Sequence, residues 1–151
     1  MADADLAIGR ATPEDFPRLK SLLKSRGMDV RGLEQVPWVL KATIGGEIVG
    51  MAGIETIGPY GFLRSFAVDK RYAGRKIGSA LWRRRLELIR EDKLSAIYGV
   101  TAFYNIPMFI HLGLQVIPRS EVPPEVRTHW QFTGLKYRLL APFYRALYLK
   151  V

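Results

Sequence analysis

The chain has 151 residues, of which 48% are hydrophobic and 25% charged, a composition typical of one globular domain with a sizeable core. It contains no cysteine, which excludes disulfide bonds, thiolate zinc sites and a cysteine nucleophile. The 23 Lys and Arg residues outnumber the 14 Asp and Glu residues, and the resulting formal net charge of +9 favours anionic ligands such as coenzymes, nucleotides, nucleic acid or a membrane surface.

The N-terminal part of the chain is predicted to form a strand, a helix and a hairpin. Residues 6–10 have the pattern of a short strand. The helix that follows begins after Thr12, a good N-cap, and has Pro13 at its first position. Two runs rich in β-forming residues then flank Gly45 and Gly46, a pair that tolerates the positive φ angles of a tight turn.

Strands and helices alternate along the rest of the chain. A third strand of the meander covers residues 62–68, and a long helix follows a basic loop and ends near Asp92. Beyond it the predicted elements are, in order, a strand at 94–101, a short helix at 105–113, a strand at 114–119, a helix at 123–132 and a final strand at 144–151. With no repeat and no linker in the pattern, we expect one α/β or α+β domain with a mixed sheet over residues 1–151.

The basic loop is the part of the sequence that points most directly to a ligand. In the stretch LRSFAVDKRYAGRKIGSALW, Arg71, Arg75 and Lys76 stand at the start of a helix, where the helix dipole makes further positive charge unfavourable. An anion is therefore expected there, held by free N–H groups of the helix start, with two glycines allowing its close approach. The loop is neither a Walker loop nor a G-x-G-x-x-G turn after the first strand.

The same loop resembles the acetyl-CoA-binding segment of the GNAT superfamily of N-acetyltransferases. That segment has the form R/Q-x-x-G-x-G/A between a strand and a helix, and it falls here on residues 73–78. The chain departs from it twice, with Ala73 in place of Arg or Gln and Lys76 in place of the internal glycine. Lys76 fits such a loop if its φ angle is negative, whereas Ala73 removes one side-chain contact.

The order of the predicted elements is also similar to that of GNAT proteins. The resemblance implies a strongly twisted, mixed sheet of about six or seven strands flanked by helices. In that fold two central parallel strands splay apart, here 63–68 and 96–101, and the pantetheine arm of acetyl-CoA lies in the gap. The coenzyme-binding residues implied in this way are Phe66, Ala67, Val68, Ala73, Gly74, Arg75, Lys76, Ile77, Gly78, Ser79 and Asn105.

Shorter pieces of the chain resemble one branch of the superfamily, the amino-acid N-acetyltransferases. RGLEQVPWVLKA, AGIE, FLRSFAV and RSEVPPEVR are similar to N-acetylglutamate-synthase-like proteins and to relatives encoded in arsenic-resistance operons. This resemblance implies direct transfer of the acetyl group of acetyl-CoA to the primary amine of a small molecule, an amino acid or an analogue. No metal is expected.

Acetyl transfer to an amine needs a base for the amine and benefits from a proton donor for the departing thiolate. Many GNAT proteins place that donor in a pattern like F-Y-x-x-x-G-F, but here Phe109 occupies the tyrosine position. Tyr104 is the candidate donor, and Tyr98 or water are the alternatives. If Tyr104 has only a structural role, it is an aromatic side chain packed in a loop. Glu55 is the candidate base, and its alternatives are a solvent-facing side chain or catalysis through water. We expect His111 to be a packing residue.

Two arginines occupy positions that the apolar pattern reserves for core residues. Arg64 lies in an otherwise apolar strand, and alternation places it on one face with Phe62, Phe66 and Val68. It either binds the carboxylate of the substrate or pairs with Glu55 or Glu121. Arg85 falls within the apolar arc of the long helix, so we expect its stem to lie along the core and its charged end to reach solvent.

Three other functions are compatible with the sequence. The departures at Ala73 and Phe109 would suit a non-catalytic acyl-CoA-binding module, and the basic charge would permit nucleic-acid binding, although no such motif is present. The tail YRLLAPFYRALYLKV could touch a membrane surface, but a final strand accounts for it more simply. No apolar run approaches ~20 residues and the start is no signal peptide, so we expect a cytoplasmic enzyme with a small-molecule partner, no nucleic acid or membrane partner, and scope for a homodimer through the last strand.

Overall fold

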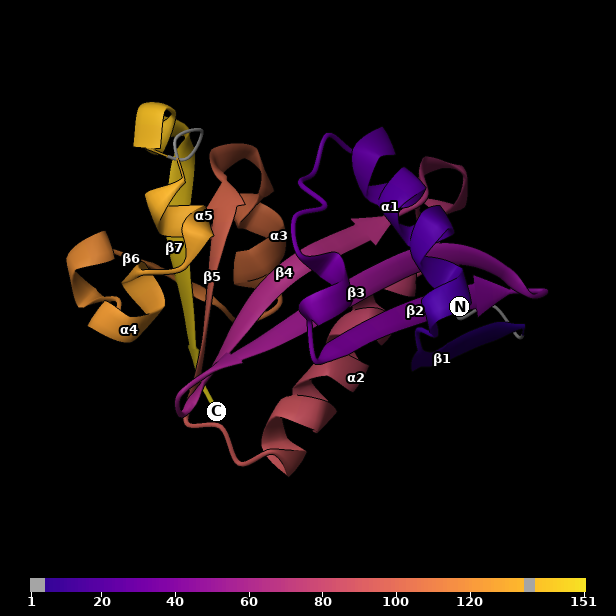
Figure 1. Ribbon diagram of the computed structural model, residues 1–151, viewed down its shortest axis with the longest axis horizontal. Helices are drawn as coiled ribbons and strands as arrows, with labels where there is room; N and C mark the ends of the chain where they lie inside the picture. The colour runs from indigo at the N-terminus through magenta and orange to yellow at the C-terminus, as the bar shows by residue number, and fades with distance from the viewer. Residues whose placement is uncertain (1–4, 135–137) are drawn as a thin grey trace. The chain divides into compact units, whose positions relative to one another are not determined.

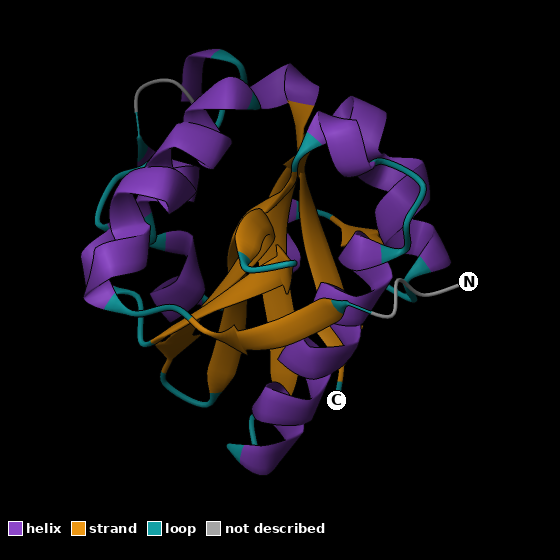
Figure 2. Cartoon of the chain, turned by 90° about the vertical axis from the view of Figure 1, so that its right-hand side faces the viewer, coloured by secondary structure: helices purple, strands orange, loops and turns teal. Residues whose placement is uncertain are grey.

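The computed structural model describes residues 5–134 and 138–151 of the chain. Its strands form one seven-stranded sheet in the order β1-β2-β3-β4-β5-β7-β6 (Figure 1), and helices flank this sheet (Figure 2). The predicted mixed α/β fold is therefore confirmed. The chain divides into two compact units, Met1–Glu55 with Arg64–Glu91 and Thr56–Leu63 with Asp92–Val151. That the chain is one domain stays a prediction.

The first unit contains the N-terminal antiparallel strands and the two longest helices. Its elements are β1 (Leu6–Arg10), α1 (Phe16–Ser25), β2 (Trp38–Ile44), most of β3 (Glu47–Ile57), the second part of β4 (Tyr60–Val68) and α2 (Ile77–Glu91). β2 pairs with β1 on one side and with β3 on the other, both antiparallel. The turn between β2 and β3 is formed by Gly45 and Gly46 with φ angles of 57° and 82°, as predicted.

The two helices of this unit pack on opposite faces of its strands. The apolar side of α1, with Leu19 and Leu23, packs on Met51 of β3. α2 lies behind the strands in the view of Figure 1 and approaches them closely at Gly50, where a Cβ atom would lie 3.0 Å from Ile77 Cγ2. Met51 and Gly50 are neighbours in β3 and therefore face opposite sides of the sheet, so these strands are covered on both faces.

The second unit is built around β5 and β7. Its elements are the first part of β4, β5 (Ala96–Ala102), α3 (Ile106–His111), β6 (Gln115–Ile117), α4 (Pro124–Arg127), α5 (Trp130–Thr133) and β7 (Tyr144–Lys150). Residues 60–63 of β4 pair in parallel with residues 96–99 of β5, while β7 runs antiparallel to both β5 and β6.

The helix predicted at residues 123–132 is two short helices instead of one. His129 separates them: its backbone is extended, and its Nδ1 accepts a hydrogen bond from the Gln131 N–H at 3.1 Å, which caps α5. The imidazole stacks on Phe62 with 4.2 Å between ring centres, and Phe132 packs edge-on against the same phenyl ring. A side-chain cap and a core contact thus end one helix and begin the next.

Among residues 5–134 and 138–151, no helix combines the length and the hydrophobicity that crossing a bilayer would require.

Candidate functional site

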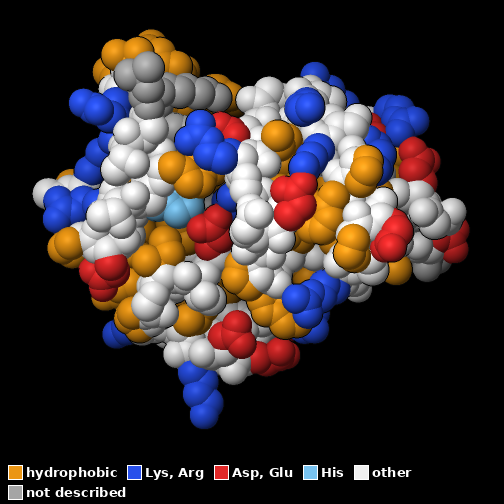
Figure 3. Space-filling model, in the orientation of Figure 1, with side chains coloured by type: hydrophobic (Ala, Val, Ile, Leu, Met, Phe, Trp, Pro, Cys, Tyr) orange, Lys and Arg blue, Asp and Glu red, His pale blue; other side chains and the backbone are white. Residues whose placement is uncertain are grey.

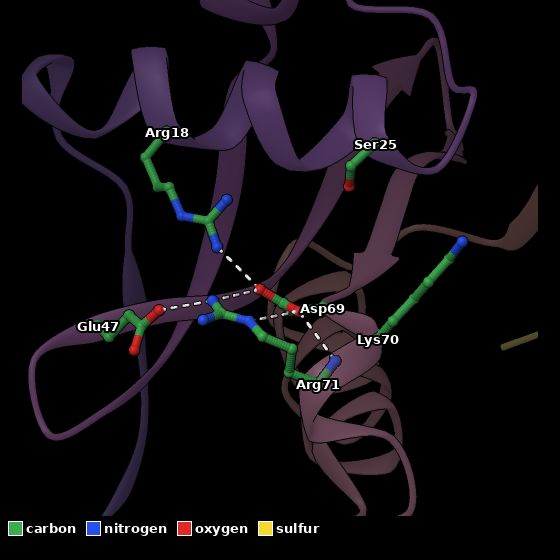
Figure 4. Close-up of a pocket in the computed structure, with 6 residues that line it drawn as sticks. All are labelled: Arg18, Ser25, Glu47, Asp69, Lys70 and Arg71. Atoms are coloured by element: carbon green, nitrogen blue, oxygen red, sulfur yellow. Dashed lines mark hydrogen bonds and ion pairs between the residues drawn. The ribbon is translucent and has the colours of Figure 1, made fainter.

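The loop between β4 and α2 is anchored at its first residue, Asp69 (Figure 4). Its N–H donates to the carbonyl of Val49 at 2.8 Å, which ties the loop to β3. Its carboxylate accepts hydrogen bonds from the backbone N–H of Arg71 at 3.0 Å and from the guanidinium groups of Arg71 at 2.9 Å and Arg18 at 3.0 Å. These bonds, those from Arg71 above all, hold the pKa of the Asp69 carboxyl well below its usual range.

Arg71 is paired with carboxylates of the protein itself. Besides Asp69, its guanidinium pairs with Glu47 at 2.8 Å, and the Tyr72 hydroxyl donates to the same Glu47 carboxylate at 3.1 Å. The anion that the sequence led us to expect beside Arg71 is therefore supplied by two side chains. In Figure 4 Lys70 points away from these ion pairs. Together with the ion-paired side chains, it lines a hollow of about 450 Å³.

The second half of the loop leaves its backbone donors unused. The N–H of Ala73 donates to the Lys70 carbonyl at 3.2 Å and that of Arg75 to the Tyr72 carbonyl at 3.4 Å. Within the described part of the chain, by contrast, the N–H groups of Gly74 and of residues 76–79 donate to no backbone carbonyl. Five donors thus gather at the positive end of α2, an arrangement suited to an anion such as a phosphate.

Two left-handed residues shape this half of the loop. Gly74 has a φ of 81° and Lys76 one of 60°. The condition set for Lys76, a negative φ, is therefore not met: the lysine adopts the conformation that the glycine of the family pattern would adopt without strain. A left-handed conformation raises the energy of a non-glycine residue by about 1–2 kcal/mol. Of the other cations here, Arg75 lies over the Tyr72 ring, 5.0 Å from its centre.

Glycine at position 78 is favoured by close packing and not by backbone conformation. A Cβ atom at this position would lie 3.3 Å from Cζ of Phe66. The first turn of α2 therefore rests directly on the β4 side chain that the resemblance places beside the coenzyme.

β4 does not alternate regularly, because Ser65 has a φ of 57° in the middle of the strand. Arg64 points to Glu55, but Phe66 lies under Arg85 of α2 and Ala67 belongs to the core around α1. The expectation that Arg64, Phe66 and Val68 share a face with Phe62 is therefore wrong. One left-handed residue moves the later side chains to the other face, as a β-bulge does. We call residues 64–66 the Ser65 kink.

Arg64 and Glu55 are brought together by this kink. The guanidinium donates from Nη1 to Glu55 at 2.9 Å, from Nη2 to the carbonyl of Arg31 at 2.7 Å and from Nε to the Ser65 hydroxyl at 2.9 Å. The Arg64 side chain is 2% exposed and that of Glu55 21%. Of the alternatives for Arg64, the pair with Glu55 is the one that the structure contains, and Glu55 keeps an edge open to solvent.

The second unit carries the candidate proton donors. Tyr104 lies in the turn before α3, is 71% exposed and meets the Phe103 ring edge-on. Tyr98 is buried between Tyr60 and Tyr148, and burial raises the pKa of its hydroxyl, which makes it a poorer acid. Tyr104 is thus the more accessible of the two tyrosines that the sequence offered.

One further expectation in these segments is corrected, and Asn105 is placed. His111, expected to pack in the core, is exposed at the end of α3. Asn105 precedes α3, but its side chain makes no capping hydrogen bond.

The sequence did not reveal the Asp69 ion pairs or the burial of Arg85. Arg85 is 0% exposed, so the expectation that its charged end reaches solvent is wrong. Its place in the arc of Ile77, Leu81 and Ile89 was the available signal. Among the described residues no group of three metal-ligating side chains gathers.

Comparison with known proteins identifies proteins that are similar to this chain. The sequence model described as the Acetyltransferase (GNAT) family matches residues 8–112. No curated protein matches the chain in sequence. Among solved structures, Rv2747 from Mycobacterium tuberculosis in complex with CoA and NLQ is similar over 96% of this chain and 99% of its own, with 20% identity and a TM-score of 0.82.

Two other solved structures extend this comparison. N-acetylglutamate synthase from Neisseria gonorrhoeae, complexed with coenzyme A and N-acetyl-glutamate, is similar over 98% of this chain with 18% identity and a TM-score of 0.81, but the match covers 35% of the synthase. A GNAT-family acetyltransferase from Staphylococcus aureus is similar over 96% of this chain and 98% of its own, with 18% identity and a TM-score of 0.77. At these identities the structures establish the fold.

Proposed function

The chain belongs to the acetyltransferase (GNAT) family, and from this premise we propose that it moves the acetyl group of acetyl-CoA directly to the primary amine of a small molecule. The observation that carries the proposal is the group of unused N–H donors at Gly74 and residues 76–79. The coenzyme A named with two of the similar structures supports the choice of anion.

The residues fit a diphosphate at the start of α2. The N–H groups there can bind its oxygens, Ser79 can add its hydroxyl, and Arg75 and Lys76 bring positive charge. The left-handed residues Gly74 and Lys76 turn successive N–H groups toward one side. The loop residues from Ala73 to Ser79, together with Phe66, Ala67, Val68 and Asn105, remain the proposed coenzyme-binding set.

Glu55 is the proposed base for the acceptor amine. An attacking amine must lose its proton, and the carboxylate can accept it directly or through one water molecule. The bond from Arg64 fixes the position of Glu55, because the guanidinium is itself held by Ser65 and by the carbonyl of Arg31. Arg64 thereby acts in the proposal through Glu55, as a positioning residue.

Tyr104 is the proposed proton donor to the departing thiolate. Its exposed hydroxyl is free to meet a ligand, whereas the hydroxyl of Tyr98 is buried. With Phe109 in the position of the usual tyrosine, water is the alternative donor.

An amino acid or an analogue is the proposed acceptor. The complexes named with N-acetyl-glutamate and NLQ in similar structures support this class. A substrate carboxylate at Arg64 would have to share the guanidinium with Glu55. If it does, Arg64→Ala raises the KM of the acceptor much more than that of acetyl-CoA.

The surface gives less support to a nucleic-acid partner. Over the first unit, the face drawn in Figure 3 carries acidic side chains among the basic ones, where binding to nucleic acid would favour an unbroken basic stripe. The remaining alternative is a coenzyme-binding module without catalysis.

Two measurements separate an enzyme from a binding module. Calorimetric titration with acetyl-CoA reports binding, and release of free thiol in the presence of a panel of amino acids reports transfer. We expect both signals. Binding without thiol release for any acceptor amine would favour the module, and the absence of both would overturn the proposed function.

A further inference from the structure

Arg85 is a buried cation that the proposed reaction does not use. It occupies the core-facing side of α2 with Ile77, Leu81 and Ile89, and its side chain is 0% exposed. Among the described residues no carboxylate lies within ion-pair distance of it. Its Nε has no hydrogen-bond partner in the part of the chain that the structure covers.

A charge in this position works against stability. Desolvation lowers the pKa of the Arg85 guanidinium, because burial penalises the charged form and no carboxylate among the described residues compensates it. An apolar side chain of similar volume at such a site is often neutral or stabilising. The presence of arginine therefore needs a reason other than core packing.

The reason lies in what the guanidinium touches. Its Nη2 donates to the carbonyl oxygen of Arg64 at 3.2 Å, and its carbon lies 5.2 Å from the centre of the Phe66 ring. Arg85 thus contacts the residue before Ser65 and the residue after it. On another side the Arg64 carbonyl is confined by Gly53, where a Cβ atom would lie 3.1 Å from the oxygen.

We propose that Arg85 is a positioning residue that holds the Ser65 kink in place and thereby selects which backbone groups of residues 66–68 face the pantetheine arm of acetyl-CoA. The proposal rests on the proposed function for the identity of the ligand. The kink itself is a property of the chain that can be measured without the ligand.

The kink affects recognition of the coenzyme because the backbone groups of a strand alternate in direction. Successive N–H and C=O groups point to opposite edges of a strand, so a change of register by one residue exchanges the groups that each edge presents. Ser65 is not a glycine, so its left-handed conformation is unfavourable unless neighbouring groups hold it. The hydrogen bond to the Arg64 carbonyl, immediately before Ser65, supplies such a restraint.

The main test replaces the cation by an apolar side chain. For Arg85→Met we expect binding of acetyl-CoA, measured by calorimetry, to weaken about tenfold. Without Arg85 the left-handed conformation of Ser65 is no longer restrained, and the energy of that conformation corresponds to a change of this order. The midpoint of urea unfolding should stay equal or rise. Arg90→Met removes an exposed arginine from the same helix and should change neither quantity.

Rescue distinguishes a positioning role from a packing role. Adding Ser65→Gly to Arg85→Met should restore binding to within about threefold of the wild type, because glycine adopts the left-handed conformation unaided. Adding Ser65→Ala also removes the hydroxyl but keeps the conformational penalty, so it should not restore binding. Should Arg85→Met fail to fold, Arg85→Lys retains the cation and N–H donors, and binding by this variant should stay within about threefold of the wild type.

The conformation of Ser65 provides the readout that does not depend on coenzyme. NMR couplings that report the φ angle of Ser65 should show a positive value in the wild type and its loss in Arg85→Met. If the φ angle and the affinity are both unchanged in Arg85→Met, or if Arg85→Lys loses as much affinity as Arg85→Met, the proposal for Arg85 is wrong. If the wild type binds no acetyl-CoA but the kink still depends on Arg85, the proposed function fails, whereas the role of Arg85 in holding the Ser65 kink stands.

Discussion

The loop between β4 and α2 has two halves that treat charge and hydrogen bonds in opposite ways. In the first half, Asp69 and Glu47 neutralise Arg71, and Asp69 ties the backbone to β3. In the second half, Gly74 and residues 76–79 keep their N–H groups unused within the described chain. One continuous basic segment therefore has two parts. In residues 69–72, the anchor half, ion pairs and hydrogen bonds are made within the protein. In residues 73–79, the receptor half, backbone N–H groups are left for a ligand.

This division teaches that a basic residue in the sequence does not by itself mark a binding position. Arg71 and Arg75 look equivalent in the stretch KRYAGRK, but Arg71 is held by two carboxylates and Arg75 lies over the Tyr72 ring. What distinguishes the receptor half is its backbone, in which left-handed residues leave donors free. Changes in the two halves should therefore affect different quantities.

The largest effect is expected from a negative charge in the receptor half. Ser79→Glu places a carboxylate in the first turn of α2, where it favours the helix but repels a diphosphate. We expect acetyl-CoA binding to weaken by about 100-fold, since opposed like charges cost several kcal/mol, while thermal stability is retained or increased. Calorimetry and thermal unfolding measure the two quantities.

Ser120→Glu serves as the control for Ser79→Glu. It makes the same change of charge at an exposed serine in the second unit. Affinity should stay near that of the wild type, and an equal loss in both variants would mean that net charge, not the position of the charge, controls binding.

A change in the anchor half should reverse this pattern. Asp69→Asn removes the ion pairs with Arg18 and Arg71 but keeps an acceptor for the Arg71 N–H. Since both arginines are partly exposed, we expect a loss of about 1–2 kcal/mol in the free energy of unfolding, measured in urea, and less than a threefold change in coenzyme affinity. Asp92→Asn, at an exposed position after α2, is the control and should alter neither quantity. A large loss of affinity with unchanged stability would contradict an anchoring role.

The anchor should also give the protein a pH-dependent stability. The pKa of Asp69 is lowered in the folded state from its ordinary value of 3.8, chiefly by the Arg71 side chain. Its contribution is therefore fully present above about pH 4 and is lost as the pH falls from there toward the folded-state value. Urea unfolding at several pH values should show a steeper loss of stability below about pH 4 for the wild type than for Asp69→Asn. Equal slopes would mean that Asp69 is not the group responsible.

The smallest effect is expected from removing strain in the receptor half. Lys76 has a φ of 60°, so Lys76→Gly should stabilise the fold by up to about 1 kcal/mol. Lys93, with a φ of 57° in the turn after α2, offers a matched substitution with the same change of charge. Lys93→Gly should stabilise similarly without affecting acetyl-CoA, whereas Lys76→Gly should also alter affinity. Identical affinities for the two variants would argue against a role for the loop backbone in binding.

Much of the fold could be predicted because periodic patterns and turn residues report local structure. The hairpin at Gly45-Gly46 and the helix of Ile77 and Leu81 were visible in this way. The split of the helix around residue 129 was not, because it depends on the contact between His129 and Phe62, which lie far apart in the sequence.

The candidate site was harder than the fold to predict from the sequence. The run FLRSFAV contains neither glycine nor proline, so nothing in it signals a left-handed Ser65. The Arg64–Glu55 pair was one of several open alternatives, and only folding selects among them. The left-handed Lys76 was hidden because lysine seldom adopts that conformation.

The most direct test of the account is an NMR titration of the wild-type chain with acetyl-CoA. We predict that the backbone amide resonances of Gly74 and residues 76–79 shift strongly, while those of Ala73 and Arg75, whose N–H groups already donate within the loop, shift less. Shifts confined to other parts of the chain, or no shifts at all, would contradict the claim that the start of α2 receives the coenzyme.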